Sequence, residues 1–473
     1  MRWINIRPER IAGGVLGTVS RLYHYLTDWN DARRPMPPPL RIIGGLGFLV
    51  MVGTVLLMLP GVGAERPLTF NEALFTATSA LSVTGLSIIV PSQDLTIYGQ
   101  LLLLLLIQIG GVGFMVVAVV TFWILGRKVS LPQRLALSDS LGLLMPGAII
   151  SLTRRVMLTV LAIEAVGAVL LWLHWYDDLG PGRAVLYAVF HAVSAFCNAG
   201  FDLFSGLPEY PQGTPNDTGT MLILGGLIFL GGLGIPVLSD LLGWRGNHRL
   251  TLHTRITLIV VITLICAGGL GLFVAEHGEN GVLYDEPWWR QLVLAFFQSI
   301  SARTAGFAGI QPFDQITYAS QLLLTVLMFI GAAPASMGGG ITTGTFAVLV
   351  LTLWGYAQGL PSAQIGGRSI APLMIRKASA VLTISLFVVL LASWLILLTH
   401  NVGIHLVVFE VISAFATCGL SLNFTGQLNP FGQYVIIFVM FWGRLGALTV
   451  VVALAQLRTH QLVEYPEENI LIG

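Results

Sequence analysis

Four short passages of this sequence end in a glycine and have the residue types needed for a cation-binding backbone turn. They read FTATSALSVTGL, FHAVSAFCNAGF, FFQSISARTAGF and FEVISAFATCGL, each with a phenylalanine ten residues before the glycine. Glycine reaches positive φ without a Cβ clash, so it can turn carbonyl oxygens inward. Rings of carbonyls replace the hydration shell of a cation. Four copies at nearly equal intervals therefore predict an ion selectivity filter around one axis.

The predicted filter consists of each glycine and the two residues before it. These residues are Val83, Thr84 and Gly85; Asn198, Ala199 and Gly200; Thr304, Ala305 and Gly306; and Thr417, Cys418 and Gly419. We expect the transported ion to bind at their carbonyl oxygens. The apolar segments before them are shorter than the ~20 residues that cross a bilayer, which predicts re-entrant half-helices. The negative ends of these helices would point at the turns and favour a cation.

The composition places these turns in a membrane protein. Hydrophobic residues make up 55% of the chain and charged residues 10%, and the mean hydropathy is +0.82. These values lie outside the range of soluble globular domains. Apolar runs of spanning length recur along the chain. Cys197, Cys266 and Cys418 are too few for a disulfide framework, so we expect them to be packing residues.

The turns require elements that hold them at one depth. We predict an all-α polytopic protein with four consecutive helix–pore-loop–helix repeats, eight spans in all, in a pseudo-fourfold arrangement around one pore. The expected first spans are 41–60, 155–175, 253–275 and 379–399, and the second spans are 97–125, 219–242, 319–354 and 432–457. The corresponding units are an N-terminal tail (1–40), repeat 1 (41–125), repeat 2 (152–243), repeat 3 (252–354), repeat 4 (376–457) and a C-terminal tail (458–473).

Charge segregation orients the chain. Connections between the repeats carry basic residues such as Arg127, Arg245 and Arg376, whereas the loops beside the glycine turns carry acidic residues such as Asp178 and Glu279. Basic loops stay in the cytoplasm. The pattern predicts that the glycine turns enter from outside, and that both termini of this cell-membrane protein are cytoplasmic.

The four turns resemble those of the Trk/Ktr/HKT superfamily of potassium uptake proteins, most closely the Ktr-type membrane subunit, over about residues 40–457. In that family one chain forms the whole pore. Serine at the first filter glycine is associated with sodium transport in the plant branch, so the glycine at position 85 implies a preference for K⁺. The resemblance also implies a homodimer and a separate cytoplasmic subunit that binds nucleotide. We expect no covalent cofactor and no nucleic-acid partner, and Na⁺ is a candidate coupling or activating ion.

A second element of the resemblance is GAAPASMGGGITTGT (Gly331–Thr345), which is too rich in glycine and too interrupted by proline for a continuous helix. It is similar to the family's intramembrane gate loop. The predicted gate residues in it are Gly338, Gly339, Gly340, Thr342 and Thr343. Thr342 stands where the family usually has lysine, which leaves the effect on gating open.

A third element is FWGRLGALT (Phe441–Thr449), which resembles the family's G-R-x-G-P-L-T with Ala447 in place of proline. Arg444 in this segment lies within an apolar run, where a charge is costly and by default functional. The resemblance implies that Arg444 lies just below the filter near the gate loop and adds an electrostatic barrier to cation flow.

Other intramembrane polar residues are assigned mainly to packing. Arg303 is expected to brace a pore loop, with Glu410 as a conceivable partner. Glu164 fits a hydrogen-bonded packing role better than an ion-ligand role. The motifs GGVG (110–113) and GGLG (231–234) predict close helix packing, because they lie in apolar spans with no preceding strand.

The leading functional prediction is potassium uptake through a gated filter. The alternative is a secondary transporter coupled to Na⁺ or H⁺ that works by alternating access, since broken helices and repeats occur there too. An enzyme is disfavoured, because the chain has no phosphate-binding loop or convincing catalytic triad, and its histidines show no ligand spacing.

Overall fold

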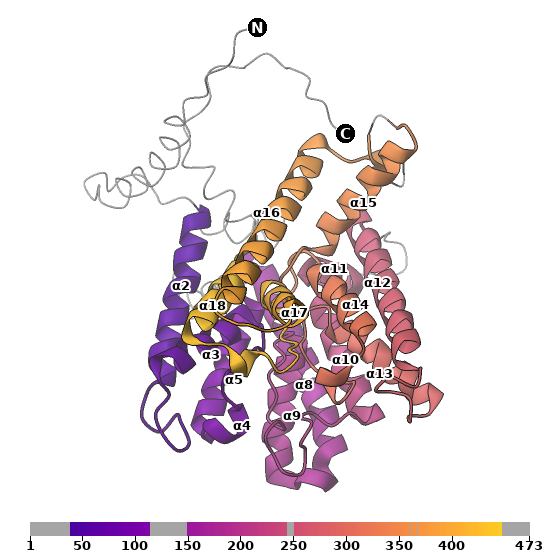
Figure 1. Ribbon diagram of the computed structural model, residues 1–473. Coiled ribbons are helices and arrows are strands. Elements are labelled where there is room, and N and C mark those ends of the chain that lie inside the picture. Colours follow the sequence, from indigo (N-terminus) through magenta and orange to yellow (C-terminus); the bar gives the residue numbers. More distant parts are fainter. Residues whose placement is uncertain (1–37, 114–148, 244–249, 361, 366, 447–473) are drawn as a thin grey trace, which may run out of the picture.

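The computed structural model describes residues 38–113, 149–243, 250–360, 362–365 and 367–446 (Figure 1). The C-terminal tail, most of the N-terminal tail and the predicted span ends at 114–125 and 447–457 lie outside these residues. The described chain is helical apart from short 3₁₀ turns and a small antiparallel hairpin of β1 (Gln364–Ile365) and β2 (Arg368–Ser369).

The helices recur in one order. A long helix is followed by a short helix that ends before a glycine turn, and then by a second apolar helix. The first group consists of α2 (Pro38–Leu57), α3 (Phe70–Ser82) and α5 (Ile97–Val112). The second consists of α8 (Ile149–Leu179), α9 (Pro181–Phe196), α10 (Thr218–Gly232) and α11 (Ile235–Leu242), and the third of α12 (Leu252–Glu276), α13 (Trp288–Ser301), α14 (Tyr318–Phe329) and α15 (Thr343–Ala357). The fourth consists of α16 (Pro372–Leu397), α17 (Ile404–Phe415) and α18 (Pro430–Leu445). Short elements between them are α4 (Pro91–Asp94), η2 (Phe313–Gln315) and η3 (Thr425–Gln427).

The helix that follows each glycine turn begins at a side-chain cap. Thr96, Asp217, Thr317 and Asn429 each accept a hydrogen bond from the backbone N–H three residues later. Capping of this kind satisfies one of the free N–H groups at the helix start and contributes about 1 kcal/mol. A side-chain cap therefore begins the second helix in every repeat, although the loop from the glycine to the cap is longer in repeat 2.

These second helices are not the uninterrupted spans that we expected. α5 ends at Gly113, α10 and α11 are separated at Gly234, and α18 ends at Gly446; φ at these glycines is 91°, 85° and 76°. α10 and α11 meet at an angle of 103°. The sequence did not reveal these breaks, because each segment is apolar throughout. A glycine does not interrupt an apolar run, but it can adopt the positive φ that ends a helix.

Three helices in the described part of the chain are individually long and apolar enough to cross a membrane, and the bent α10–α11 pair could be a fourth span. The three segments are Val156–Leu179, Leu252–Glu276 and Pro372–Leu397. Only 22% to 33% of their most apolar windows is buried within the protein. Most of their apolar surface therefore faces outward, as expected for helices in contact with lipid.

The short helices before the glycine turns form the centre of the molecule. Phe75, Phe190 and Phe409 are at most 1% exposed, and they pack with the ends of the other short helices into one hydrophobic core. Each short helix packs against the long helix of its own repeat: α3 on α2, α9 on α8, α13 on α12 and α17 on α16. The core thus places the four glycine turns next to one another.

Candidate ion filter and gate

The four glycine turns lie against one another in a closed ring. An added Cβ on each glycine would come within 2.7 Å of a backbone carbonyl oxygen in the next turn. The pairs are Gly85 with Ala199, Gly200 with Ala305, Gly306 with Cys418, and Gly419 with Thr84. The last pair returns to the first turn, so the contacts run once around an axis. The ring leaves no space for a side chain at any of the four glycines.

The backbone repeats the same unusual conformation in all four turns. Each glycine has positive φ, and so has the residue two positions before it: Val83 at 59°, Asn198 at 59°, Thr304 at 91° and Thr417 at 50°. Three of these four residues are β-branched, for which positive φ is a genuine outlier. Such conformations cost about 1–3 kcal/mol each and cluster at functional sites. The strain therefore makes the turns the candidate site.

One serine at the end of each short helix holds its turn. The hydroxyl oxygens of Ser79 and Ser413 accept hydrogen bonds from the N–H of Gly85 (3.1 Å) and Gly419 (3.0 Å). In the other two turns Ser194 and Ser301 donate to the carbonyl of the residue after the glycine, at 2.7 and 2.6 Å. The turns are thus fixed to the helices that carry them.

The third turn is shifted by one residue relative to the motif. Ser301 lies five residues before its glycine, whereas the other three serines lie six residues before theirs. The buried phenylalanine in this helix is Phe297, and Phe296 is only half-buried. The spacing of ten residues therefore does not describe the packing in repeat 3.

The loop between α14 and α15, residues 330–342, lies directly against the third and fourth turns. The N–H of Gly339 donates to the hydroxyl of Thr417 at 2.8 Å, and an added Cβ on Gly338 would overlap the hydroxyl of Thr304. The third gate glycine, Gly340, has φ of 76°. The structure thus brings these three glycines together with the predicted filter residues.

The two threonines of the predicted gate lie at the start of α15. Thr342 is its N-cap, and its hydroxyl accepts from the N–H of Thr345 at 3.4 Å. Thr343 is buried, and its N–H donates to the carbonyl of Ala332 at 3.1 Å. Thr342 is therefore a helix cap in this structure.

Arg444 connects the loop to two repeats. Its guanidinium donates to the carbonyl of Met337 in the loop and to the carbonyls of Gly110 and Gly111 at the end of α5, the last at 3.3 Å. Within the described residues it has no ion pair with a carboxylate. The positive charge is thus held by carbonyl oxygens beside the 330–342 loop.

Arg303 holds the other end of the same loop. It is 6% exposed and donates to the carbonyl of Gly331 at 2.9 Å. The suggested pairing of Arg303 with Glu410 is wrong, because Glu410 accepts hydrogen bonds from Ser421 (2.7 Å) and Thr425 instead. Each buried charged group found local hydrogen-bond partners rather than a partner of opposite charge.

The glycine motifs outside the ring have the packing role that we expected. An added Cβ on Gly110 would come within 2.8 Å of the carbonyl oxygens of Leu81 and Ala80, and one on Gly231 would overlap the carbonyl of Phe196. These carbonyls lie at the ends of α3 and α9. The second helices therefore approach the short helices backbone to backbone, directly behind the ring.

Glu164 lies in a buried cluster at the end of α9, next to the second turn. Its carboxylate accepts from the side-chain amide of Gln108 at 3.1 Å and contacts the sulfur of Cys197 at 3.7 Å. These three side chains join α5, α8 and the end of α9. Hydrogen bonding between helices is the role that this placement supports.

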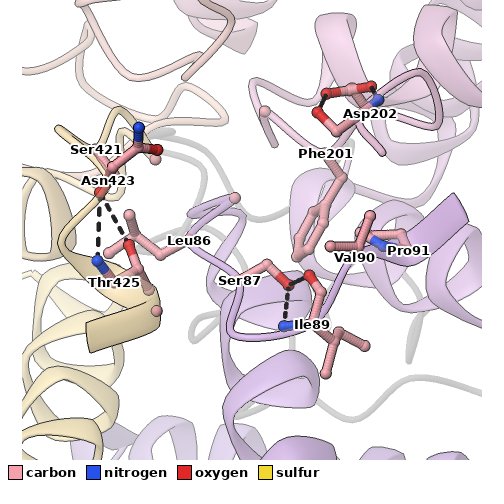
Figure 2. Close-up of a pocket in the computed structure, with 15 residues that line it drawn as sticks. Leu86, Ser87, Ile89, Val90, Pro91, Phe201, Asp202, Ser421, Asn423 and Thr425 are labelled. Atoms are coloured by element: carbon pink, nitrogen blue, oxygen red, sulfur yellow. Dashed lines mark hydrogen bonds between the residues drawn. The ribbon is translucent and has the colours of Figure 1, made fainter. Parts of the chain in front are cut away.

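A cavity of about 510 Å³ opens beside the ring. Three of the glycine turns contribute to its lining, and Figure 2 shows Ser421, Asn423 and Thr425 on one side of it and Asp202 on the other. The carboxylate of Asp202 accepts from the N–H groups of Phe204 and Ser205, at 2.5 and 2.8 Å. The cavity therefore has an acidic residue at its wall.

Asp202 was missed in the sequence. It lies two residues after Gly200, where the other turns have Ser87, Ala308 and Ser421. The signal was present, because an acidic residue directly after one of four repeated turns distinguishes that turn from the others.

Comparisons with known proteins identify the family of this chain. A family model for TrkH, described as a cation transport protein, matches residues 48–465. The chain is 37% identical to Ktr system potassium uptake protein B of Vibrio alginolyticus, over 94% of this chain and 96% of that protein. It is 33% identical to the potassium/sodium uptake protein NtpJ of Enterococcus hirae, over 93% of this chain and 98% of that one.

The fold is also found among solved structures. The potassium transporter TrkH from Vibrio parahaemolyticus superposes with a TM-score of 0.71 at 19% identity, covering 89% of this chain and 85% of that one. At this identity the likeness concerns the fold alone. The family match, in contrast, extends over most of the sequence. The chain therefore belongs to the TrkH family of cation transport proteins, and it is a membrane transport protein rather than an enzyme.

Proposed function

We propose that this chain takes up K⁺ across the cell membrane through a selectivity filter formed by the four glycine turns. The observation that carries the proposal is the closed ring of backbone contacts among Gly85, Gly200, Gly306 and Gly419. Relatives named as potassium uptake proteins, which match nearly the whole chain, support K⁺ as the ion.

The backbone conformation suggests how the ring would bind the ion. In each turn the glycine and the residue two positions before it have positive φ, and the residue between them does not. This alternation would direct the carbonyls of successive residues toward the same side of the turn. The short helices end at the turns, so the negative ends of four helix dipoles point at the ring. No charged side chain is needed to attract a cation to such a site.

The 330–342 loop is the proposed gate. Hydrogen bonds from Arg303 and Arg444 hold it, and a bond to Thr417 attaches it to the fourth turn. The positive charge of Arg444 would oppose a cation that leaves the filter. An inside-negative potential, worth about 2.3 kcal/mol per charge per 100 mV, would drive inward flux.

The wider organisation is part of the same proposal. It includes four pore-loop repeats with eight spans, cytoplasmic termini, a homodimer and a cytoplasmic nucleotide-binding subunit that controls the gate. Na⁺ remains a second candidate ion, because one relative is named a potassium/sodium uptake protein.

Flux into proteoliposomes tests the proposed function. The purified protein would be supplied with K⁺, Rb⁺, Na⁺ or Li⁺ at a set membrane potential, and then with a Na⁺ or H⁺ gradient in place of the potential. We expect K⁺ and Rb⁺ flux that follows the potential, with little Na⁺ or Li⁺ flux. Flux that requires the second gradient would instead support coupled alternating access.

A first prediction concerns Asp202 at the cavity wall. We expect Asp202→Asn to lower the apparent affinity for external K⁺ by about two- to fivefold with little change in maximal flux, because a carboxylate at a pore mouth concentrates cations. An amide oxygen can still accept from the N–H groups of Phe204 and Ser205, so the turn is retained. The measurement is K⁺ uptake against K⁺ concentration, at low and high ionic strength.

The control for Asp202→Asn is Glu279→Gln, which removes an exposed acidic side chain outside this cavity. The difference between the two variants should shrink at high salt, because screening weakens the field of an accessible charge. Equal effects of both variants, or an effect that salt does not change, would contradict a local role for Asp202.

A further inference from the structure

Three of the short helices carry a buried polar side chain that reaches the chain leaving the ring. We call His191 in α9, Gln298 in α13 and Glu410 in α17 the brace residues. All three are 0% exposed. They come from helices that are far apart in sequence, yet each binds the segment two or more residues beyond its own glycine. A single kind of contact thus recurs behind three of the four turns.

The hydrogen bonds of the brace residues are well defined. The Nε2 atom of His191 accepts from the N–H of Leu203 at 3.3 Å, while its Nδ1 lies 2.7 Å from the carbonyl of Tyr187. A proton on Nδ1 satisfies both contacts. The side-chain oxygen of Gln298 accepts from the N–H of Gly309 at 2.8 Å. Both residues therefore bind the backbone just outside the ring.

Glu410 differs from the other two brace residues in its chemistry. It is a carboxylate, and it accepts from the hydroxyls of Ser421, at 2.7 Å, and of Thr425. Ser421 and Thr425 also line the cavity beside the ring (Figure 2). No basic side chain pairs with Glu410 among the described residues. Placing an unpaired carboxyl group here is costly, which points to a function for the position.

The brace residues occupy equivalent positions. His191 and Glu410 lie nine residues before their glycines, and Gln298 lies eight residues before, in agreement with the one-residue shift of repeat 3. The corresponding residue of repeat 1 is Thr76, whose buried hydroxyl has no hydrogen-bond partner in the described part of the chain. The first turn thus lacks this contact, which makes Thr76 a natural control.

We propose that Glu410 is a positioning residue for ion selection, which fixes the outer end of the fourth turn through Ser421 and Thr425. This inference rests on the proposed filter function. A carbonyl ring discriminates between K⁺ and Na⁺ only while its oxygens keep their arrangement. The serine at the helix end holds each turn on one side, and the brace residue holds the chain on the other. His191 and Gln298 have the same role in repeats 2 and 3.

The test compares K⁺ and Na⁺ uptake by proteoliposomes containing Glu410→Ala, Glu410→Gln or Thr76→Val. We expect Glu410→Ala to lower the K⁺/Na⁺ uptake ratio by about tenfold, the factor that corresponds to one buried hydrogen bond. Glu410→Gln keeps an acceptor for one hydroxyl, so we expect it to recover most of the ratio. Thr76→Val removes an unpartnered hydroxyl and should leave the ratio unchanged.

A double variant tests whether Glu410 acts through its hydroxyl partners. Ser421→Ala and Thr425→Val should each lower the ratio by a smaller factor than Glu410→Ala. Combining Ser421→Ala with Glu410→Ala should add nothing to the effect of Glu410→Ala, because the bond is already lost. If Glu410→Ala does not fold, the single variants Ser421→Ala and Thr425→Val test the proposal, because each removes one hydroxyl partner of Glu410. A wild-type ratio in both would then overturn the proposal.

The outcomes also separate this proposal from the filter itself. If Glu410→Ala folds and keeps the wild-type ratio, or if Thr76→Val changes the ratio equally, the positioning role is wrong. If a variant of a ring glycine also leaves the ratio unchanged, the ring is not the filter and the proposed function fails. Loss of selectivity in the glycine variant alone would overturn only the role of Glu410.

Discussion

Gly419→Ala should remove most of the preference for K⁺ over Na⁺ and lower K⁺ uptake at least about tenfold. Two physical effects combine at this position. Gly419 has φ of 94°, and an added Cβ would overlap the carbonyl of Thr84 and lie 3.2 Å from the Cα of Gly85. The positive φ alone costs about 1–3 kcal/mol. The overlap involves rigid backbone, so the ring must open between the fourth and first turns.

Two control variants separate these effects. Gly226→Ala places a methyl group on an exposed position of α10 that has no atom within 4 Å, and helix propensity predicts a small gain in stability. Gly61→Ala introduces the same strain as the filter variant, with φ of 88°, but again no atom lies within 4 Å. We expect both to keep wild-type selectivity. Thermal unfolding of the purified proteins shows whether Gly61→Ala carries the cost of strain alone.

The filter interpretation would be contradicted by a folded Gly419→Ala protein whose K⁺/Na⁺ uptake ratio equals that of Gly226→Ala. A lower flux with an unchanged ratio would mean that the ring limits passage without choosing the ion. The measurement is therefore the ratio for each variant, taken in the same proteoliposome preparation together with the flux.

Part of this arrangement could be predicted from the sequence. Four glycines with matching neighbours indicated four turns, and the structure brings those turns into one ring. The register of repeat 3 was missed, because the ten-residue spacing points to Phe296 rather than to the adjacent Phe297. The signal was the serine. It lies four residues after the phenylalanine in the other three repeats, and Ser301 has this spacing from Phe297, whereas Ile300 lies four residues after Phe296. The core buries Phe297 accordingly.

The breaks in the second helices had a different cause. In GGVG and GGLG the first glycine packs against a short helix, and the last glycine takes positive φ and ends the helix. The first role was predicted from the sequence and the second was missed, since glycine gives no signal of its φ. The partners of Arg303 and Glu410 were equally inaccessible. Opposite charges suggested a pair, but a buried arginine can be held by a carbonyl and a buried carboxylate by hydroxyls.

The second large effect is expected from Arg444→Gln, which should raise K⁺ flux through the resting protein by about tenfold or more. The guanidinium holds the 330–342 loop at Met337 and binds the end of α5 at Gly110 and Gly111. Its removal should loosen the loop, and it eliminates a positive charge beside the proposed ion path. For scale, two unit charges about 8 Å apart interact with about 2 kcal/mol at an effective dielectric constant of about 20. Both consequences act in the same direction on flux.

A matched pair of variants decides which consequence dominates. Arg444→Lys keeps the charge but cannot reach several carbonyls as the planar guanidinium does, so it tests the loosened loop alone. Arg376→Gln removes an exposed positive charge near the start of α16 and should leave flux unchanged. A flux for Arg444→Lys near wild type, with Arg444→Gln raised, would assign the barrier to the charge. Raised flux in both would assign it to the loop. If Arg444→Gln folds and its flux falls, the contacts of Arg444 support the conducting path and the proposed barrier is wrong.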